Sequence, residues 1–311
     1  MARILVTGAA GFIGRALCGG LVERGHALVG RSRRPAEPIP DVELLPIGDI
    51  GPTTDWSGHL DRIEIVVHLA TRAHGPRREA ADHSEAQAAR VLAHSAAKAG
   101  VRRLIHMSSV RAMGEATLPG APFRGTDPPC PRDPYGRGKL AIERALQAAA
   151  LETGIEIVIL RPPLVYGPGV KANFRALMRL VASGLPLPFA GIDNRRSLIF
   201  IDNLVDLLGQ ACLHPGAAGR VLLARDSADL STPELIRLLG TGLGRPGRLF
   251  SVPGPALSML RRVPKLGPLL ARLTLSLQVD DAETRAVLDW RPAVSPEIGL
   301  AVTAAAFRGR S

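Results

Sequence analysis

The sequence predicts an α/β fold, a doubly wound parallel Rossmann sheet with a smaller, discontinuous C-terminal substrate domain. Short β-branched or apolar runs recur along the chain, and most of them are separated by Ala-rich stretches that suit helices. This alternation is typical of a parallel sheet with helices on both faces. The runs expected to form strands are 3–7, 26–29, 42–45, 63–69, 104–107, 155–160 and 221–223.

The expected boundary between the two domains is discontinuous. The density of proline and glycine rises after Tyr166 and again from Gly240 to Pro268, which indicates a second domain assembled from late loops and helices. We therefore expect two segments in each domain. The Rossmann domain is expected to comprise residues 1–167 and 197–228, and the substrate domain residues 168–196 and 229–311.

Size and cysteine usage are typical of a chain that folds without cross-links. The 311 residues are 46% hydrophobic, which is enough for a substantial core. Cys18, Cys130 and Cys212 are widely spaced and form no CxxC pair, so neither a disulfide framework nor a cysteine zinc site is expected. The eight histidines show no spacing typical of metal ligands, and the expected chemistry requires no metal. These features favour a reducing, cytoplasmic compartment.

No membrane insertion is expected. The N-terminus runs from Met1 straight into the apolar residues 4–6, which leaves no room for a signal peptide. The apolar stretch 251–279 is interrupted by charged residues and prolines, so it cannot be a spanning helix. One interpretation of this stretch is an amphipathic segment at a membrane interface, and the other is a set of helices that close a substrate pocket.

The net charge of +11 is compatible with nucleic acid, a membrane surface or anionic substrates as partners. Only four of the 39 basic residues are lysines, and the arginines are spread along the chain without a compact basic run or interleaved aromatic residues. We therefore expect no nucleic-acid partner. The sequence leaves the oligomeric state open, with a homodimer among the alternatives.

A glycine-rich turn directly follows the first expected strand. Residues 7–14 read TGAAGFIG and open an apolar helix expected over 12–22. Gly8 permits the tight turn, Gly11 lets the backbone approach a pyrophosphate, and Gly14 allows the helix to pack closely on the strand. The start of the helix offers free N–H groups to the anion. This context favours a dinucleotide site over the alternative, a purely structural turn.

The second expected strand ends in cations, where NAD sites usually carry an acid. No Asp or Glu occurs between Glu23 and Glu37, and residues 30–34 read GRSRR. Ser32 and Arg33 suit a 2′-phosphate, so the pattern favours NADP(H) over NAD(H) as the cofactor. The alternative is that these arginines only reflect the high arginine content of the chain.

Tyr135 and Lys139 are the expected catalytic pair. They lie four residues apart at the start of an Ala-rich helix expected to reach Ala150, so they share one face. The ammonium would lower the phenol pKa from about 10 toward the operating pH, which lets the phenol exchange a proton with a substrate oxygen. Gly136 and Gly138 weaken this helix by about 1 kcal/mol each relative to Ala, without an evident structural gain.

A serine pair, Ser108 and Ser109, follows the fifth expected strand. Open α/β sheets bind ligands at the carboxyl edge, so a hydroxyl here would reach the reacting oxygen. A turn or cap residue is the alternative interpretation of such a pair. The presence of Tyr135 and Lys139 downstream favours the catalytic interpretation for Ser109.

Together these motifs resemble the extended short-chain dehydrogenase/reductase family, in its NAD-dependent nucleotide-sugar epimerase, dehydratase and reductase branch, over nearly the whole chain. Residues 7–14 resemble the cofactor loop of the family, 68–70 its loop beside the nicotinamide, and 135–139 its active-site signature. Ser109 falls where the family places its catalytic Ser or Thr. With the residues named above, the expected cofactor contacts are Gly8, Gly11, Phe12, Ile13, Gly14, Ser32, Arg33, Asp49, Ile50, Leu69, Ala70, Thr71, Tyr135, Lys139 and Pro162.

The resemblance also implies a nucleotide-sugar site. Residues 161–168 are similar to the segment that leads into that site, and 194–196 to the segment that supplies an arginine to the diphosphate. Met113 and Leu164 depart from the family pattern, which usually has Tyr and Asn at these positions. The implied substrate contacts are Ser109, Asn173, Arg196 and Arg272.

The expected function is NAD(P)-dependent oxidoreduction at C4 of a nucleoside-diphosphate hexose, because the chain most resembles bacterial UDP-hexose C4 reductases and epimerases for surface polysaccharide. The leading hypothesis is reduction of a 4-keto UDP-sugar, in which Tyr135 donates the proton, Lys139 supports it and Ser109 holds the carbonyl. The first alternative is a UDP-sugar 4-epimerase of the UDP-glucose 4-epimerase kind, which must retain NAD because the hydride returns to the same sugar. The second is a non-catalytic NAD(P)-sensing protein, which the intact catalytic set argues against.

Overall fold

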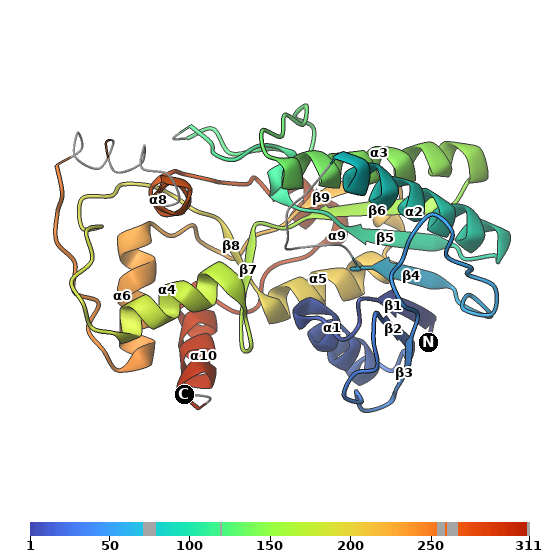
Figure 1. The fold of residues 1–311 in the computed structure, drawn as a ribbon, viewed down its shortest axis with the longest axis horizontal. Coiled ribbons are helices and arrows are strands. Elements are labelled where there is room, and N and C mark those ends of the chain that lie inside the picture. The colour runs from blue at the N-terminus through green and yellow to red at the C-terminus, as the bar shows by residue number, and fades with distance from the viewer. Residues whose placement is uncertain (71–78, 119, 254–258, 260–266, 310–311) are drawn as a thin grey trace.

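A seven-stranded parallel sheet forms the centre of the molecule (Figure 1). The computed structural model describes residues 1–70, 79–118, 120–253, 259 and 267–309. Every expected strand is present, and the predicted fold class is confirmed. The strands, in the order β3-β2-β1-β4-β5-β6-β9, are β1 (Arg3–Thr7), β2 (Ala27–Ser32), β3 (Val42–Pro46), β4 (Ile65–His68), β5 (Arg103–Met107), β6 (Glu156–Arg161) and β9 (Val221–Leu223).

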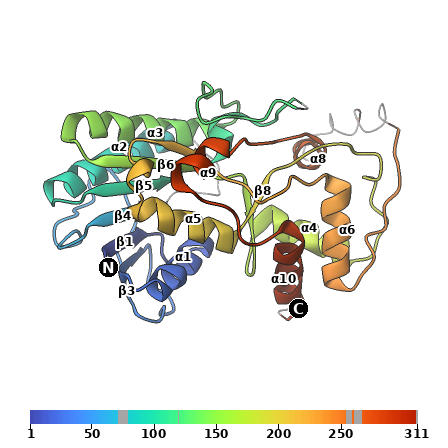
Figure 2. The same ribbon diagram turned by 180° about the vertical axis from the view of Figure 1, so that it is seen from behind.

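Helices cover both faces of this sheet, because alternate residues of each buried strand point to opposite sides. In β1, Ile4 packs in the core with Leu17 of α1, whereas the next residue, Leu5, packs in a second core with Leu92 of α2 and Leu146 of α3. Figures 1 and 2 show α2 and α3 on one side and α1 and α5 on the other. These helices are α1 (Phe12–Glu23), α2 (Glu79–Lys98), α3 (Pro134–Thr153) and α5 (Ile201–Leu213).

The strand order changes direction between β1 and β4, and this change places the candidate site. Thr7 of β1 is paired with His68 of β4, and the chain leaves these two strands toward opposite sides of the sheet. Open α/β sheets bind ligands in the crevice at such a point. The first glycine turn and the 68–70 loop therefore meet at the carboxyl edge.

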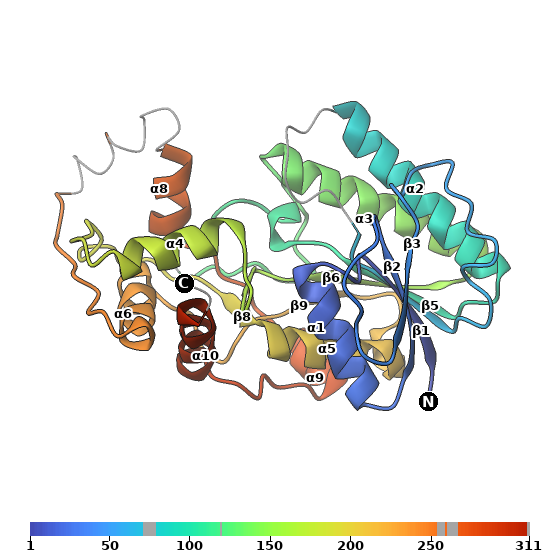
Figure 3. The same ribbon diagram turned by 60° about the horizontal axis from the view of Figure 1, so that its bottom comes forward.

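A second group of helices lies beyond the carboxyl edge, apart from the sheet (Figure 3). Helix α6 packs against α4 and α10, and Phe174 of α4, Ile236 of α6 and Leu300 of α10 belong to the same core as Ile4. The remaining elements are η1 (Val110–Ala112), β7 (Leu164–Tyr166), α4 (Ala172–Ala182), β8 (Leu198–Phe200), η2 (Pro215–Ala217), α6 (Thr232–Leu243), α8 (Gly267–Thr274), α9 (Ala282–Leu288) and α10 (Pro296–Arg308).

Strands β7 and β8 form a separate two-stranded parallel sheet that the sequence pattern did not predict. Each has only three residues, which is too short to show a period of two. Tyr166 at the end of β7 is fully buried and donates a hydrogen bond to Asp226 at 2.7 Å. The small sheet thus extends the main core toward α4.

Two sequence expectations concern membranes and cross-links. Among the described residues, no helix has the length and apolar character needed to cross a bilayer. Much of the late apolar stretch, including 260–266, lies outside the described residues. Cys18, Cys130 and Cys212 are all free, and only Cys130 is exposed.

Candidate active site

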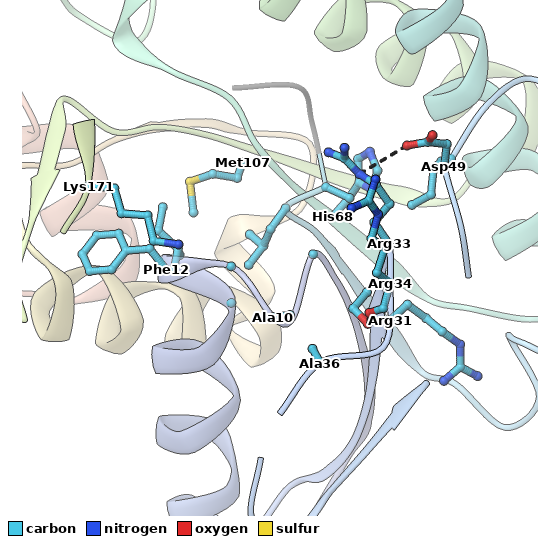
Figure 4. Close-up of a pocket in the computed structure, with 18 of the residues that line it drawn as sticks. Ala10, Phe12, Arg31, Arg33, Arg34, Ala36, Asp49, His68, Met107 and Lys171 are labelled. Carbon is cyan, nitrogen blue, oxygen red and sulfur yellow. Dashed lines mark hydrogen bonds and ion pairs between the residues drawn. The ribbon is translucent and has the colours of Figure 1, made fainter. Parts of the chain in front are cut away.

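A cavity of about 1030 Å³ lies over the carboxyl ends of β1, β2 and β4 (Figure 4). At one end it is lined by Arg31, Arg33, Arg34 and Asp49, a group we call the β2 end. From there the wall follows the glycine turn and residues 68–70. At the other end it reaches Met107 and the segment 170–174. A cavity of this volume can hold a ligand that contains several rings.

The glycine turn is built for close approach of backbone atoms. Gly8 has φ of +72°, in the left-handed region that favours glycine. A Cβ on Gly14 would lie 2.7 Å from the Cα of Ala9, so the third glycine lets α1 start directly against the turn. Gly11 caps α1 without a side-chain hydrogen bond, and the first turn carries no acidic residue. The helix amides beside Phe12 and Ile13 can therefore receive an anion.

At the β2 end, the strand finishes without a carboxylate. The hydroxyl of Ser32 donates to the backbone oxygen of Arg34 at 2.7 Å, so it is already used within the turn. Arg33 Nε lies 3.2 Å from Asp49 Oδ1, and both side chains are well exposed. Ile50, next to Asp49, also lines the cavity. The only acidic group among these lining residues therefore comes from the loop after β3.

Arg31 is a cavity residue that the sequence interpretation missed. It is 4% exposed, and its Nε donates to Nδ1 of His59 at 3.1 Å. Burial lowers the pKa of Arg31 below its usual value. The sequence interpretation took Ser32 and Arg33 as a hydroxyl followed by a cation that suit a 2′-phosphate, and nothing in the sequence distinguishes the buried arginine from the exposed one.

The loop after β4 is held by a buried hydrogen-bond chain. Thr7 Oγ1 accepts from the amide of Ala70 at 3.2 Å and lies 2.8 Å from Nδ1 of His68. Burial, with a smaller effect from the charge of Lys139, lowers the pKa of His68 to about 3. Through its bonds to His68 and Ala70, the Thr7 hydroxyl holds Leu69 and Ala70 at the cavity wall. Thr71 lies outside the described residues.

Tyr135 and Lys139 lie in the first two turns of α3. Lys139 is 2% exposed, and its Nζ donates to the backbone oxygen of Met107 at 2.7 Å. The same Nζ lies 6.0 Å from the centre of the Tyr135 ring. Because Met107 lines the cavity, this contact ties the ammonium to a residue of the cavity wall. Such an arrangement favours the phenolate form of tyrosine.

Ser109 is half-buried at the start of η1. Its Oγ accepts from the amide of Arg111 at 3.2 Å, so the side chain has the cap geometry that was the alternative interpretation. Pro162 is buried nearby, and its backbone oxygen accepts from the amide of Val110 at 3.0 Å. Neither residue belongs to the cavity lining, and Tyr135 and Lys139 do not belong to it either. Of these four residues, Lys139 contacts the lining directly, through Met107.

The glycine that follows Tyr135 has a structural reason that sequence analysis did not find. A Cβ on Gly136 would lie 2.9 Å from the carbonyl carbon of Arg111 and 2.9 Å from Cβ of Pro131. Real Cβ contacts are not this short, so any other residue would push α3 away from η1. The expectation that Gly136 has only a cost is wrong, because the close approach of two segments requires it.

A group of buried polar residues, here called the buried network, lies beneath these side chains and was not predicted. It consists of Ser108, Met113, Glu143 and Arg161. Arg161 donates to both oxygens of Glu143, at 3.0 and 2.5 Å, and its third nitrogen contacts Met113 Sδ. The hydroxyl of Ser108 also donates to Glu143. The available signal was spacing, since Glu143 lies one turn after Lys139 on α3.

The expected substrate residues Ser109, Asn173, Arg196 and Arg272 lie on four separate segments. Arg196 bonds the backbone oxygen of Leu275 at 2.8 Å, and burial, with the charges of Arg111 and Arg272, lowers its pKa to about 10. The positive charges of Arg111 and Arg272 thus act on Arg196. Arg111 was not among the predicted site residues. Asn173 lies elsewhere, exposed at the start of α4, where it lines the cavity.

Metal chemistry finds no support in the part of the chain that the structure describes. No group of three or more His, Cys, Asp or Glu side chains there is arranged to hold a metal ion. The buried His106 lies beside His68, with ring centres 5.6 Å apart and the rings tilted by 31°, and burial holds the pKa of His106 well below its usual value. Both rings are therefore uncharged side chains at the ends of β4 and β5.

Comparisons with known proteins agree with this geometry. A UDP-glucose 4-epimerase from Vibrio cholerae is 40% identical, over 98% of this chain and 95% of the relative. The solved structure of MoeE5 in complex with UDP-glucose and NAD is 26% identical, with a TM-score of 0.77 over 99% of both chains. A UDP-glucuronic acid 4-epimerase from Bacillus cereus, solved with UDP-glucuronic acid and NAD, shares the fold with a TM-score of 0.80 at 24% identity, over 99% of this chain and 100% of that one.

The family itself follows from a match along most of the chain. The model of the NAD dependent epimerase/dehydratase family matches residues 4–222. That range includes the glycine turn, Ser109, the pair on α3, and Arg196. The chain belongs to the NAD-dependent epimerase/dehydratase family, within the extended short-chain dehydrogenases/reductases, and is an enzyme of that family.

Proposed function

We propose that the enzyme transfers a hydride at C4 of a UDP-hexose and that its reaction is a UDP-sugar 4-epimerisation. The observation that carries this proposal is the placement of Lys139 Nζ, 6.0 Å from the centre of the Tyr135 ring and anchored on Met107 at the cavity wall. The identity of 40% with the Vibrio cholerae UDP-glucose 4-epimerase supports the substrate class. The UDP-glucose bound in MoeE5 supports it further.

In this proposal Tyr135 moves the proton at O4 of the sugar. The nearby Lys139 ammonium lowers the phenol pKa, so the phenolate can accept the hydroxyl proton and later return it. Ser109 gives a hydrogen bond to the same oxygen. To do so its hydroxyl proton must point away from the Arg111 amide, and that is how the cap leaves it, because Oγ accepts that bond. A nicotinamide held along the cavity would supply the hydride acceptor for this step and the donor for its reversal.

The residues around the cavity fit a nicotinamide dinucleotide. The free amides at the start of α1 suit the pyrophosphate, and the β2 end, with Asp49 and Ile50, suits the adenosine. Leu69 and Ala70 would face the nicotinamide, with Thr71 and Pro162 retained as further contacts. NAD in the complexes of MoeE5 and the Bacillus cereus enzyme supports this assignment.

For the sugar nucleotide we propose contacts from Arg196, Arg272 and Asn173. The guanidinium groups suit a diphosphate because their planar forks match phosphate oxygens. Burial first, and then the charges of Arg111 and Arg272, lower the pKa of Arg196, so an anion bound beside this buried guanidinium would be favourable. We also propose the division into 1–167 with 197–228 and 168–196 with 229–311, which assigns α4, α6, α8 and α10 to substrate binding.

Reduction of a 4-keto UDP-sugar with NADPH is a second candidate, favoured by the β2 end. Strand β2 ends without an acidic residue, and the cavity there is lined by Arg31, Arg33 and Arg34. An epimerase returns the hydride to the same sugar and keeps its NAD, whereas a reductase releases an oxidised cofactor after each turnover. The two reactions therefore differ in what the purified enzyme carries.

The test begins with nucleotide released by denaturing the purified enzyme. The enzyme is then given UDP-glucose and UDP-galactose without added cofactor, and 4-keto UDP-sugars with NADPH or NADH. Retained NAD and sugar interconversion are the expected results. Empty enzyme that oxidises NADPH only with a 4-keto sugar would replace epimerisation by reduction. Neither activity, with no bound cofactor, would reject both.

A further inference from the structure

Arg111 joins the two segments that carry the candidate catalytic side chains. It lies in η1, two residues after Ser109, and its backbone amide donates to Ser109 Oγ at 3.2 Å. Its guanidinium Nη2 donates to Oδ2 of Asp133, which lies two residues before Tyr135. A single residue is therefore bonded to the serine on one side and to the start of α3 on the other.

Asp133 transmits this contact to the helix. Its Oδ1 accepts from the amide of Gly136 at 2.6 Å, which is the N-cap bond of α3, while its Oδ2 is held by Arg111. Because the two oxygens are bound from different directions, the carboxylate has one orientation. The first turn of α3, which contains Tyr135, is placed by that orientation.

Backbone packing adds a second constraint. Gly136 lies so close to the Arg111 carbonyl that no side chain fits between α3 and η1. The amide of Cys130 also donates to the backbone oxygen of Met113 at 3.1 Å, just beyond η1. The start of α3 therefore packs closely against η1, and the ion pair fixes the orientation of one segment relative to the other.

The ion pair between Arg111 and Asp133 is less exposed to water than a surface ion pair, so its attraction is screened less. The side chains of Arg111 and Asp133 are 22% and 21% exposed, and Glu115 gives the same Nη2 a second carboxylate at 2.8 Å. At the other end of α3 the pair between Arg90 and Glu152 is 52% and 42% exposed. Water screens the second pair more strongly, so its loss should matter less.

We propose that Arg111 is a positioning residue that sets where the Tyr135 phenol stands relative to Ser109. It acts through Asp133 and does not touch the reacting atoms. The proposal rests on the proposed function, since it assigns the proton transfer to Tyr135. Direct binding of the substrate by Arg111 is the competing role, and the two roles change different kinetic constants.

The test uses three variants and one control. Arg111→Met removes the guanidinium, and Arg111→Lys keeps a charge without the planar fork. Asp133→Ser keeps an N-cap residue but removes the charged partner. Arg90→Met removes the exposed pair from the far end of α3. Each variant is checked for folding by circular dichroism, and kcat and KM are measured with the UDP-hexose that the wild type converts.

Arg111→Met and Asp133→Ser should each lower kcat by about 10 to 100-fold, the effect of a small misplacement of a reacting group. KM for the sugar and the Kd for NAD should stay within about twofold. Arg111→Lys should recover part of the loss, and Arg90→Met should behave as wild type. A fourth variant that combines Arg111→Met with Asp133→Ser should be no worse than the poorer of the two single variants, because both substitutions remove the same contact.

Two results would overturn the inference. A rise in KM at unchanged kcat would make Arg111 a substrate contact, and an unchanged kcat in folded Arg111→Met would remove it from the reaction. If Arg111→Met does not fold, the same criteria apply to Arg111→Lys and Asp133→Ser. Failure of the proposed function looks different, because the wild type itself would then not interconvert UDP-glucose and UDP-galactose.

Discussion

The Arg161–Glu143 pair beneath the candidate active site and the Arg33–Asp49 pair at the β2 end have the same chemistry and opposite surroundings. The side chains of the first pair are 5% and 1% exposed, whereas those of the second are 61% and 70% exposed. The first is bidentate and shares Glu143 with Ser108. The second is one contact at 3.2 Å.

The difference decides what each pair can do. A pair in water is worth only about 0–1 kcal/mol, so Arg33 can leave Asp49 and contact a ligand at little cost. A buried pair cannot open without leaving an unpaired charge, so Glu143 and Arg161 hold the ends of β5 and β6 on α3 as one unit. The same residue types therefore serve recognition at the β2 end and positioning beneath the active site.

The largest expected effect comes from the side chain that the buried network supports. Tyr135→Phe should lower turnover by about 10²–10⁴-fold, the usual contribution of a positioned acid or base. Cofactor affinity and the free energy of unfolding should change much less than turnover, because the substitution keeps the ring and removes only one oxygen. Steady-state kinetics and calorimetric NAD binding measure the two quantities. Wild-type turnover would remove Tyr135 from the reaction.

Breaking the buried pair should give the next largest effect. Glu143→Ala leaves Arg161 buried without a partner, and loss of one member of such a pair costs about 3–5 kcal/mol. Urea unfolding monitored by circular dichroism measures this loss. Asp49→Ala is the matched change at the β2 end and should cost less than about 1 kcal/mol. Equal costs for the two variants would show that burial does not separate the pairs.

The buried histidines His68 and His106 should make the stability of the protein depend on pH. The folded pKa of His68 is about 3 and that of His106 is also far below 6.5, so both bind protons only in the unfolded chain near pH 6. Their contribution to stability is complete above the unfolded pKa and is lost as pH falls below about 6.5.

Replacing one of these histidines should reduce that slope. His68→Gln should lower it by up to about 1.4 kcal/mol per pH unit, the contribution of one proton. The exposed His83→Gln on α2 is the control and should leave the slope unchanged. Unfolding free energies from urea titrations between about pH 7 and about pH 5 give both slopes. Identical slopes for wild type and His68→Gln would contradict the buried neutral imidazole.

The smallest effect is expected at the β2 end. Arg33→Ala should raise KM for NADPH more than KM for NADH if this arginine binds a 2′-phosphate, and it should change the unfolding free energy by less than about 1 kcal/mol. Parallel titrations of the two reduced cofactors measure the difference. Equal changes in both constants would leave the enzyme without a 2′-phosphate contact at Arg33.

The parts of the fold that the sequence predicted are those that depend on neighbours along the chain. The seven strands of the main sheet each show an apolar run, and the turn at Gly8 and Gly14 follows from the shape of one short loop. The spacing of Tyr135 and Lys139 is a property of a single helix. In each case the physical cause lies within a few residues, so a pattern can reveal it.

The parts that were missed depend on contacts between distant segments. Arg161 and Glu143 are 18 residues apart, and Arg111 reaches Asp133 across 22 residues. In a chain rich in arginine, nothing local distinguishes a buried guanidinium from an exposed one. The glycine at position 136 shows the same limit, because its reason is the carbonyl of Arg111 on another segment.

The central claim is that a nicotinamide bound in this cavity exchanges a hydride with a sugar whose proton is moved by Tyr135. The direct test is the absorbance of reduced nicotinamide after enzyme loaded with NAD or NADP is mixed with a panel of UDP-hexoses. The absorbance should rise in the wild type, and its rise should be greatly slowed in Tyr135→Phe. An enzyme that binds neither cofactor, or a Tyr135→Phe variant that reduces the cofactor at the wild-type rate, would contradict it.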